Sequence, residues 1–200
     1  MDKTLVINGS PRPHKSNSKK YASLIEKHYK GEIINMNLVK HKPESIVETL
    51  DECKTLIFVF PLYVDSLPAR LLDFLKYLEA NPPKNKPVIH IMINCGFFEP
   101  YQNDVALKMM RYYCRLNEYE VGSTFILGAG EAILTTPFAF LVELKLKKFA
   151  KSIVNKKYQS FQMTMPLTKP LYLMGSKRYW INKGKVWGLT EQDMRRMEIE

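Results

Sequence analysis

Residues 5–18 read Leu-Val-Ile-Asn-Gly-Ser-Pro-Arg-Pro-His-Lys-Ser-Asn-Ser. A short apolar run, Leu5–Asn8, stops abruptly at Gly9, which predicts a buried strand followed by a loop. Ser16 or Asn17 can cap a helix that carries apolar residues at helical spacing. The stretch therefore predicts a strand, a polar loop and a helix in succession.

The same alternation continues along the chain. Apolar runs predict four more strands, at 32–36, 55–60, 88–93 and 121–127. Helical spacing predicts helices at 44–50, from Pro68 to the Pro82-Pro83 pair, at 103–116 and at 138–154. Strands that alternate with helices indicate a parallel sheet with right-handed crossovers. We expect an α/β domain built on a five-stranded parallel sheet.

The C-terminal part of the chain differs from the rest. Beyond Tyr158 the pattern fades, and only a short helix at 191–197 is expected. We therefore divide the chain into a domain at 1–158 and a basic, aromatic extension at 159–200. The net charge of +10 is concentrated toward this end, because residues 145–200 hold 13 Lys or Arg against 4 Asp or Glu. Such a segment forms either a solvated surface or a contact with anionic partners.

Composition excludes several classes of protein. With 46% hydrophobic residues the chain can form a core, and since no run of about 18 uncharged apolar residues occurs, we expect no transmembrane segment. Met1-Asp-Lys leads directly into the first strand, so we expect no secretory signal. Cys53, Cys95 and Cys114 are odd in number and widely spaced, which favours reduced thiols and a cytoplasmic location. The four histidines show no metal-ligand spacing, so we expect no metal site.

The loop at 9–18 has the composition of a phosphate site. Ligands of open parallel sheets bind beyond the carboxyl ends of the strands, where this loop is expected to lie. Its serines offer hydroxyls, Arg12 can add a charge-assisted contact, and the helix start at Asn17 presents free backbone N–H groups. The loop matches neither the G-x-G-x-x-G fingerprint of dinucleotide-binding proteins nor the P-loop of nucleotide hydrolases.

Two further loops follow predicted strands at the same edge. The segment 61–68 carries apolar and aromatic residues that can pack against a flat ring. In the segment 94–100, Gly96 permits close backbone approach, and Phe97 and Phe98 either line a planar pocket or pack in the core. No histidine follows Cys95 nearby, which favours a small buried residue over a nucleophile.

Together the three loops closely resemble those of the flavodoxin-like family of NAD(P)H-dependent FMN reductases and quinone reductases, over roughly residues 1–155. The resemblance rests on Gly9-Ser-Pro-Arg12 with Ser16-Asn-Ser18, on Pro61-Leu-Tyr-Val-Asp65 and on Asn94-Cys-Gly-Phe97. It implies a flavodoxin-like three-layer sandwich in which the first loop holds the FMN phosphate and the others border the isoalloxazine. The cofactor-binding residues implied in this way are Ser10, Arg12, Ser16, Asn17, Ser18, Pro61, Leu62, Tyr63, Val64, Asn94, Cys95, Gly96 and Phe97.

The resemblance also implies an activity. NAD(P)H would reduce FMN, and a quinone, free flavin or similar small acceptor would reoxidise it, within a homodimer. Because the flavin carries the hydride, no catalytic side chain is required, and no triad or carboxylate pair stands out in the sequence.

Two alternatives stay open. The chain can be a one-electron carrier like flavodoxins, although these are usually acidic and this chain is basic. It can also bind anions through Lys177-Arg-Tyr-Trp-Ile-Asn-Lys183, where aromatic and basic residues alternate. A tail that packs on its own domain or on a partner explains the same residues, and we expect no specific nucleic acid partner.

Overall fold

The computed structural model describes residues 3–12 and 15–196. Within these residues six strands form one sheet, in the order β2-β1-β3-β4-β5-β6. All neighbouring strands are parallel. The strands are β1 (Lys3–Asn8), β2 (Ile33–Asn37), β3 (Cys53–Pro61), β4 (Val88–Asn94), β5 (Val121–Leu127) and β6 (Ser160–Met163).

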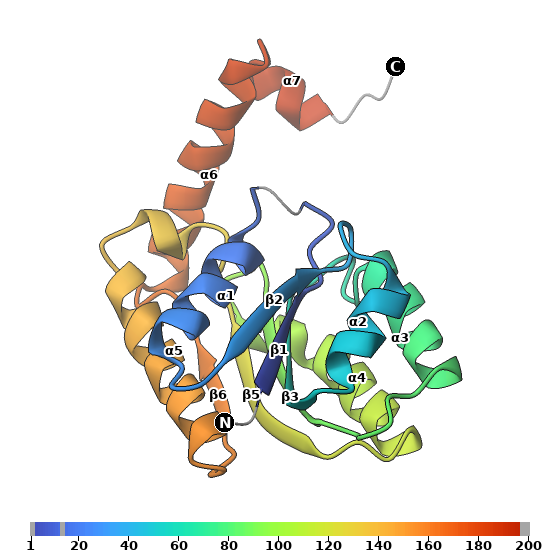
Figure 1. Cartoon of the computed structure of the whole chain (residues 1–200). Coiled ribbons are helices and arrows are strands. Elements are labelled where there is room, and N and C mark those ends of the chain that lie inside the picture. The colour runs from blue at the N-terminus through green and yellow to red at the C-terminus, as the bar shows by residue number, and fades with distance from the viewer. Residues whose placement is uncertain (1–2, 13–14, 197–200) are drawn as a thin grey trace. The chain divides into compact units, whose positions relative to one another are not determined.

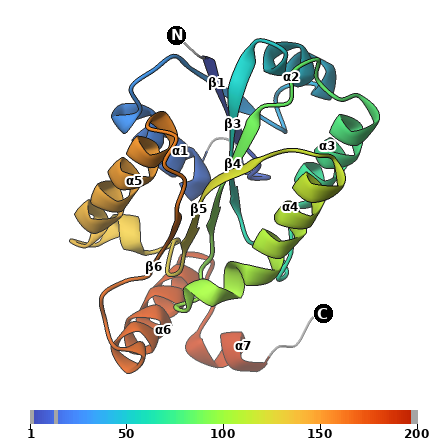
Figure 2. The ribbon, with the colours of Figure 1, turned by 90° about the horizontal axis from the view of Figure 1, so that it is seen from below.

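Helices cover both faces of the sheet and give the domain three layers. Figure 2 shows α1 (Asn17–His28) and α5 (Ala139–Val154) together on one face. The opposite face carries α2 (Pro43–Leu50), α3 (Ala69–Ala80) and α4 (Asp104–Leu116) (Figure 1). Two short 3-10 helices, at Pro100–Asn103 and Ile133–Thr135, complete the connections.

The two covered faces explain the composition of the strands. Residues 56–60 of β3 are all buried and all apolar, as a strand with helices on both sides requires. Polar residues stand instead where strands end: Asn8, Asn37 and Asn94 are the last residues of β1, β2 and β4, and each is buried. The strand order changes direction between β1 and β3, the position where such sheets bind ligands.

The predicted number of five strands is wrong, because β6 adds a sixth at the edge next to β5. This strand has four residues, pairs with Thr124–Leu127 and alternates between half-buried and exposed positions. A short edge strand covered on one side carries too few apolar residues to be recognised in the sequence. Since β6 lies after residue 158, the sheet extends into the segment that the sequence assigned to the C-terminal extension.

The chain divides into two compact units, Met1–Thr164 and Met165–Glu200. The second unit holds α6 (Lys169–Val186) and α7 (Glu191–Arg196), of which the sequence predicted only the shorter helix. Pro170 stands in the first turn of α6, where a missing N–H group costs no hydrogen bond. The apolar residues of α6 also do not gather on one face, so they left no periodic signal. None of the described helices combines the length and apolarity that a membrane span requires.

His90, in the middle of β4, is a buried histidine with a structural role. It is 1% exposed, and its Nδ1 accepts a hydrogen bond of 2.8 Å from the backbone N–H of Ser123. The ring fills the space over Gly122, since a Cβ there would stand 2.2 Å from it. Burial lowers the pKa of His90 to about 4, so the ring is neutral in the folded chain at neutral pH.

We expect His90 to make the folded state sensitive to acid. Between pH 6.5 and pH 4 the unfolded chain binds a proton that the folded chain excludes. The free energy of unfolding therefore decreases by about 3 kcal/mol as the pH is lowered from 6.5 to 4. His90→Gln keeps an acceptor and removes this titration. Urea unfolding at several pH values should therefore give a shallower pH slope for the variant than for the native chain. Equal slopes would contradict this role.

Candidate functional site

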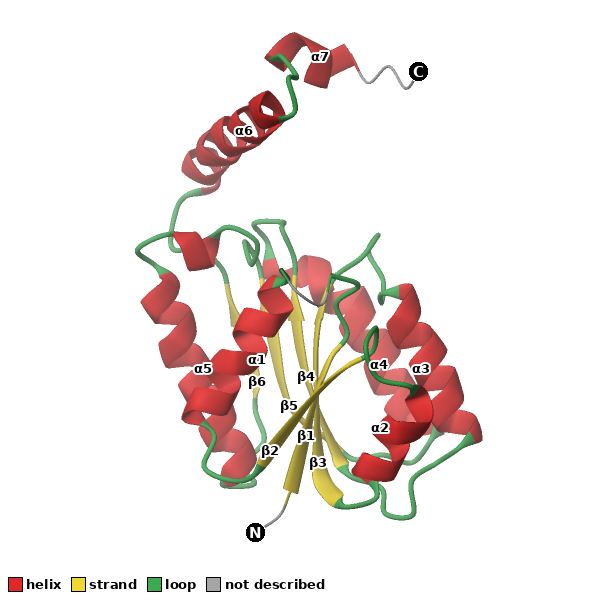
Figure 3. Ribbon diagram, turned by 45° about the horizontal axis from the view of Figure 1, so that its top comes forward, coloured by secondary structure: helices red, strands yellow, loops and turns green. Residues whose placement is uncertain are grey.

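A cavity of about 220 Å³ opens at the carboxyl ends of β1, β3 and β4. Figure 3 shows the loops that leave these strand ends gathered at one edge of the sheet. All three loops singled out in the sequence contribute to it, although they are far apart in the chain. The lining residues are Ser10, Pro11, Arg12, Lys15, Ser16, Asn17, Ser18, Pro61, Leu62, Tyr63, Asn94, Cys95, Gly96 and Glu131.

The first loop folds around Asn8 and Ser16. The Asn8 Oδ1 accepts a bond of 2.9 Å from the N–H of Ser10, and Asn8 Nδ2 lies 3.4 Å from Ser16 Oγ. Ser16 caps α1, because its Oγ accepts a bond of 3.1 Å from the N–H of Lys19. The backbone N–H groups of Asn17 and Ser18 belong to the first turn of α1, where a helix leaves its donors without intrahelical partners. This end of the cavity is therefore suited to an anion; Pro13 and His14 lie outside the described residues.

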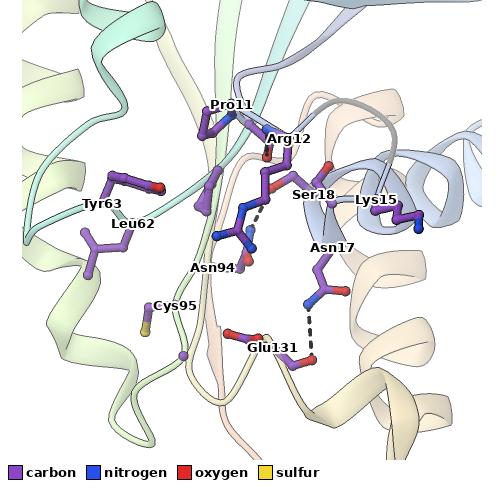
Figure 4. A pocket seen from close by; sticks show the side chains of 14 residues that line it. Pro11, Arg12, Lys15, Asn17, Ser18, Leu62, Tyr63, Asn94, Cys95 and Glu131 are labelled. Atoms are coloured by element: carbon purple, nitrogen blue, oxygen red, sulfur yellow. Dashed lines mark hydrogen bonds between the residues drawn. The ribbon is translucent and has the colours of Figure 1, made fainter. Parts of the chain in front are cut away.

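Two asparagine side chains join the loops to one another (Figure 4). Asn94 Nδ2 donates to Ser18 Oγ and to the carbonyl oxygen of Phe60, both at 3.1 Å. Asn17 Nδ2 donates to the carbonyl oxygens of Gly130 and Glu131, at 3.2 and 3.1 Å. These bonds fix the start of α1 against β3, β4 and the loop after β5, so the cavity wall is built before any ligand binds.

The second loop is a tight hairpin turn. Tyr63 and Ser66 exchange two backbone hydrogen bonds, of 3.0 and 2.9 Å, around Val64 and Asp65. Both central residues have positive φ, 47° and 55°, as a type I′ turn requires. Val64 is 92% exposed and does not line the cavity, whereas Leu62 and Tyr63 do.

The third loop packs against the glycine-rich segment that follows β5. The N–H of Gly130 donates to the carbonyl oxygen of Cys95 over 2.7 Å, and Tyr21 OH donates to that of Gly130 over 2.5 Å. A Cβ at Gly128 would stand 2.4 Å from the carbonyl oxygen of Phe98, so only glycine permits this approach. No local pattern in the sequence indicates this contact, because Gly128 and Phe98 are about thirty residues apart in the chain.

Cys95 has the chemistry of a structural thiol. Burial raises its pKa, and Asn103 Nδ2 lies 3.3 Å from its Sγ. The described cysteines are all free and buried. A protonated, buried thiol is a poor nucleophile, in agreement with the prediction from the sequence.

The charges on the cavity wall are unequal. Two cations, Arg12 and Lys15, and one carboxylate, Glu131, are among the lining residues, and the Arg12 side chain reaches into the cavity in Figure 4. Pro11, Lys15 and Glu131 were not among the predicted residues. Pro11 and Lys15 are part of the first loop and were within reach of the same argument. Glu131 had no local signal, since only the packing of the loop after β5 brings it to the site.

All candidate residues except Val64 and Phe97 line the cavity. Val64 occupies the tip of the hairpin, which points into solvent, and Phe97 is half-exposed beyond Gly96. Sequence position within a loop did not distinguish the residue at its tip from those at its base. No cluster of three potential metal ligands occurs among the described residues.

Comparisons with known proteins give the fold a name. No family model matches the chain, and no curated protein matches it in sequence. Solved structures do match. An FMN-dependent NADH-azoreductase from Bacillus anthracis, determined in complex with FMN, is 16% identical over 80% of this chain and 100% of its own, with a TM-score of 0.56.

Two further structures have different activities in their names. A flavodoxin from Streptococcus pneumonia TIGR4 is 14% identical over 78% of this chain and 99% of its own, with a TM-score of 0.57. An NAD(P)H:quinone oxidoreductase from Methanothermobacter marburgensis is 10% identical over 76% and 95%, with a TM-score of 0.59. The chain therefore has a flavodoxin-like fold, as the resemblance of the three loops implied.

The hairpin at Val64 should be a point of stored strain. A β-branched residue in the left-handed region costs roughly 1–2 kcal/mol, and an exposed side chain recovers little of this by packing. Val64→Asn should raise the free energy of unfolding by about 1 kcal/mol, because asparagine tolerates this conformation. The matched control, Val64→Ile, keeps the strain and should leave stability unchanged. Chemical denaturation measures both, and no gain in the asparagine variant would contradict the assignment.

Proposed function

We propose that this chain binds FMN in the cavity at the ends of β1, β3 and β4, and transfers a hydride from NAD(P)H through it to a quinone, free flavin or similar small acceptor. The observation that carries this proposal is the polarity of the cavity. One end is formed by the start of α1 with Arg12 and Lys15, and the other by Pro61, Leu62 and Tyr63. A ligand with a phosphate at one end and an apolar ring at the other fits this arrangement.

The phosphate end offers donors rather than acceptors. The N–H groups of Asn17 and Ser18 lie at the positive end of the α1 dipole, and Arg12 can add a bidentate contact. Ser16 and Ser18 hydroxyls line the same wall, held by Asn8 and Asn94. This donor set favours a dianion over a neutral or cationic ligand.

The ring end offers flat apolar surface and open space. Gly96 lines the cavity, and a Cβ built on it would approach only Glu131 Oε2, at 3.8 Å. The backbone of the third loop can therefore approach a planar ligand closely, while Leu62 and Tyr63 provide the opposite side. Leu62 is itself fixed, because its N–H donates to the carbonyl oxygen of Asn94 over 2.8 Å.

When bound, FMN supplies hydride acceptance and donation, so the protein must only bind, orient and shield it. The Asn94 and Asn17 hydrogen bonds keep the cavity wall in place, and Cys95 stays protonated because burial raises its pKa. Glu131 is the carboxylate among the lining residues. Its negative charge disfavours an anion in the part of the cavity next to it, away from Arg12 and Lys15.

The names of the structural neighbours support the proposed class, since they include an FMN-dependent azoreductase and a quinone oxidoreductase. They also include a flavodoxin, which keeps a pure electron carrier as the second candidate. The homodimer and the cytoplasmic location remain predictions. Anion binding by the tail also remains a prediction. In the tail, the Lys183 ammonium group lies 4.7 Å from the ring centre of Trp180.

The decisive experiment is a titration of the purified chain with FMN, followed by anaerobic mixing with NADH and NADPH. We expect stoichiometric uptake of FMN and rapid loss of the oxidised flavin absorbance with at least one nicotinamide. Uptake without reduction would favour the electron carrier. A chain that takes up no FMN would sink the proposal.

A substitution that fills the cavity should separate binding from folding. Gly96→Leu places a side chain into the cavity without backbone strain, since Gly96 has no positive φ. We expect FMN affinity to fall at least about a hundredfold, with the free energy of unfolding within about 0.5 kcal/mol of native. Gly128→Leu is the contrasting variant, because its Cβ would overlap the Phe98 carbonyl and unfold the loop. Undiminished FMN binding by Gly96→Leu would place the ring elsewhere.

A further inference from the structure

A second cavity, of about 320 Å³, lies between α1 and the turn that follows β2. Its wall includes Asn8 and Asn37, which are neighbours in register at the ends of β1 and β2. Lys19, Lys40, His41 and Glu26 form much of the rest. None of these residues lines the cavity proposed for FMN.

Asn37 is the unusual member of the three asparagines at strand ends. It is only 8% exposed, and its Oδ1 accepts a bond of 2.8 Å from the N–H of Val39. Its Nδ2 is buried and has no hydrogen-bond partner among the described residues. The amides of Asn8 and Asn94, by contrast, are both engaged. A buried donor without an acceptor is costly, and a ligand acceptor in this cavity would satisfy it.

His41 is held against the turn by its ring nitrogen. Its Nδ1 lies 3.1 Å from both the backbone nitrogen and the carbonyl oxygen of Asn37. The turn itself is tight, because the N–H groups of Lys40 and His41 both donate to the carbonyl oxygen of Asn37, at 3.1 and 3.0 Å. The orientation of the imidazole is therefore set by the backbone next to it.

The charge of the cavity is positive on balance. Lys19 and Lys40 supply two ammonium groups, while the carboxylate of Glu26 accepts a bond of 2.9 Å from Asn35 Nδ2. The amide N–H of Asn37, two ammonium groups and an imidazole outnumber the one carboxylate among the lining residues. Such a set recognises an anion with several oxygen acceptors.

The second cavity adjoins the first through the end of β1. Asn8 lines the second cavity and lies 3.4 Å from Ser16 Oγ, which lines the first. Lys19, which lines the second cavity, is the third residue of α1, and the two residues before it line the first cavity. A ligand held here would stand beside the proposed cofactor with one strand end between them.

We propose that this second cavity is a subsite for a phosphate group with several free anionic oxygens. Two sources share that chemistry, the 2′-phosphate of NADPH and free inorganic phosphate. The nucleotide source rests on the proposed function, because only a nicotinamide-dependent enzyme would use it. The donor set itself does not depend on flavin binding.

Calorimetric titrations of the full chain, with and without excess FMN, test the subsite with 2′,5′-ADP, 5′-AMP and inorganic phosphate. We expect 2′,5′-ADP to bind at least about tenfold more tightly than 5′-AMP. Asn37→Asp keeps the acceptor for Val39 but replaces the buried donor with a negative charge, and should weaken 2′,5′-ADP binding at least about tenfold. Lys40→Met should weaken it by a similar factor. Inorganic phosphate that binds as tightly as 2′,5′-ADP would assign the subsite to the free ion.

The matched control is Lys20→Met, which removes a charge from the same helix outside both cavities. It should bind 2′,5′-ADP as the native chain does, and all variants should keep native FMN affinity and native circular dichroism. The subsite is disproved if the native chain binds neither phosphate nor 2′,5′-ADP, or if folded Asn37→Asp and Lys40→Met both bind as tightly as native. A chain that binds 2′,5′-ADP but no FMN would keep the subsite and overturn the flavin proposal.

Discussion

A parallel sheet covered by helices on both faces admits few polar side chains along its strands, and the cavities of this structure form where polar residues end those strands. Asn8, Asn37 and Asn94 are the buried polar residues with which β1, β2 and β4 end. Asn8 and Asn37 each accept a hydrogen bond from the backbone N–H two residues further on, in the turn that follows the strand. Asn94 instead donates to the carbonyl oxygen of Phe60 in the neighbouring strand. The same carboxamides that terminate the strands therefore shape both cavities.

The two cavities differ in how far the protein satisfies its own donors. At the first cavity, the side-chain amides of Asn94 and Asn17 donate hydrogen bonds to neighbouring loops. The donors left for a ligand are backbone N–H groups, hydroxyls and Arg12. At the second, Asn37 keeps one amide nitrogen unpaired among the described residues, beside an imidazole oriented by the same turn. Both arrangements place donors in position before a ligand arrives, so little side-chain entropy is lost on binding.

Several strained residues and close approaches lie in the loops at the edge of the sheet that holds the cavities. Val64 sits in the left-handed region at the tip of one loop, and Ala129 does so in the segment that supports another. Gly128 lies against the carbonyl oxygen of Phe98, which only the absence of a Cβ allows. The packed sheet supplies the rigidity that holds these unfavourable conformations, while Gly122 and His90 show similar complementarity within the core.

Local patterns in the sequence were enough to predict the alternation of strands and helices, the parallel sheet and the three loops that meet at its edge. Each of these depends on local patterns, such as the apolar run of β3 or the serines before α1, which need no distant partner to be recognised. Only the tertiary structure decided which residue within a loop faces the cavity, as Val64 and Leu62 show. It alone brought Glu131 and Gly130 to Asn17, added the short edge strand β6, and closed a cavity between α1 and Asn37. These features arise from contacts between segments far apart in the chain, whose free energy depends on packing rather than on the spacing of residues along it.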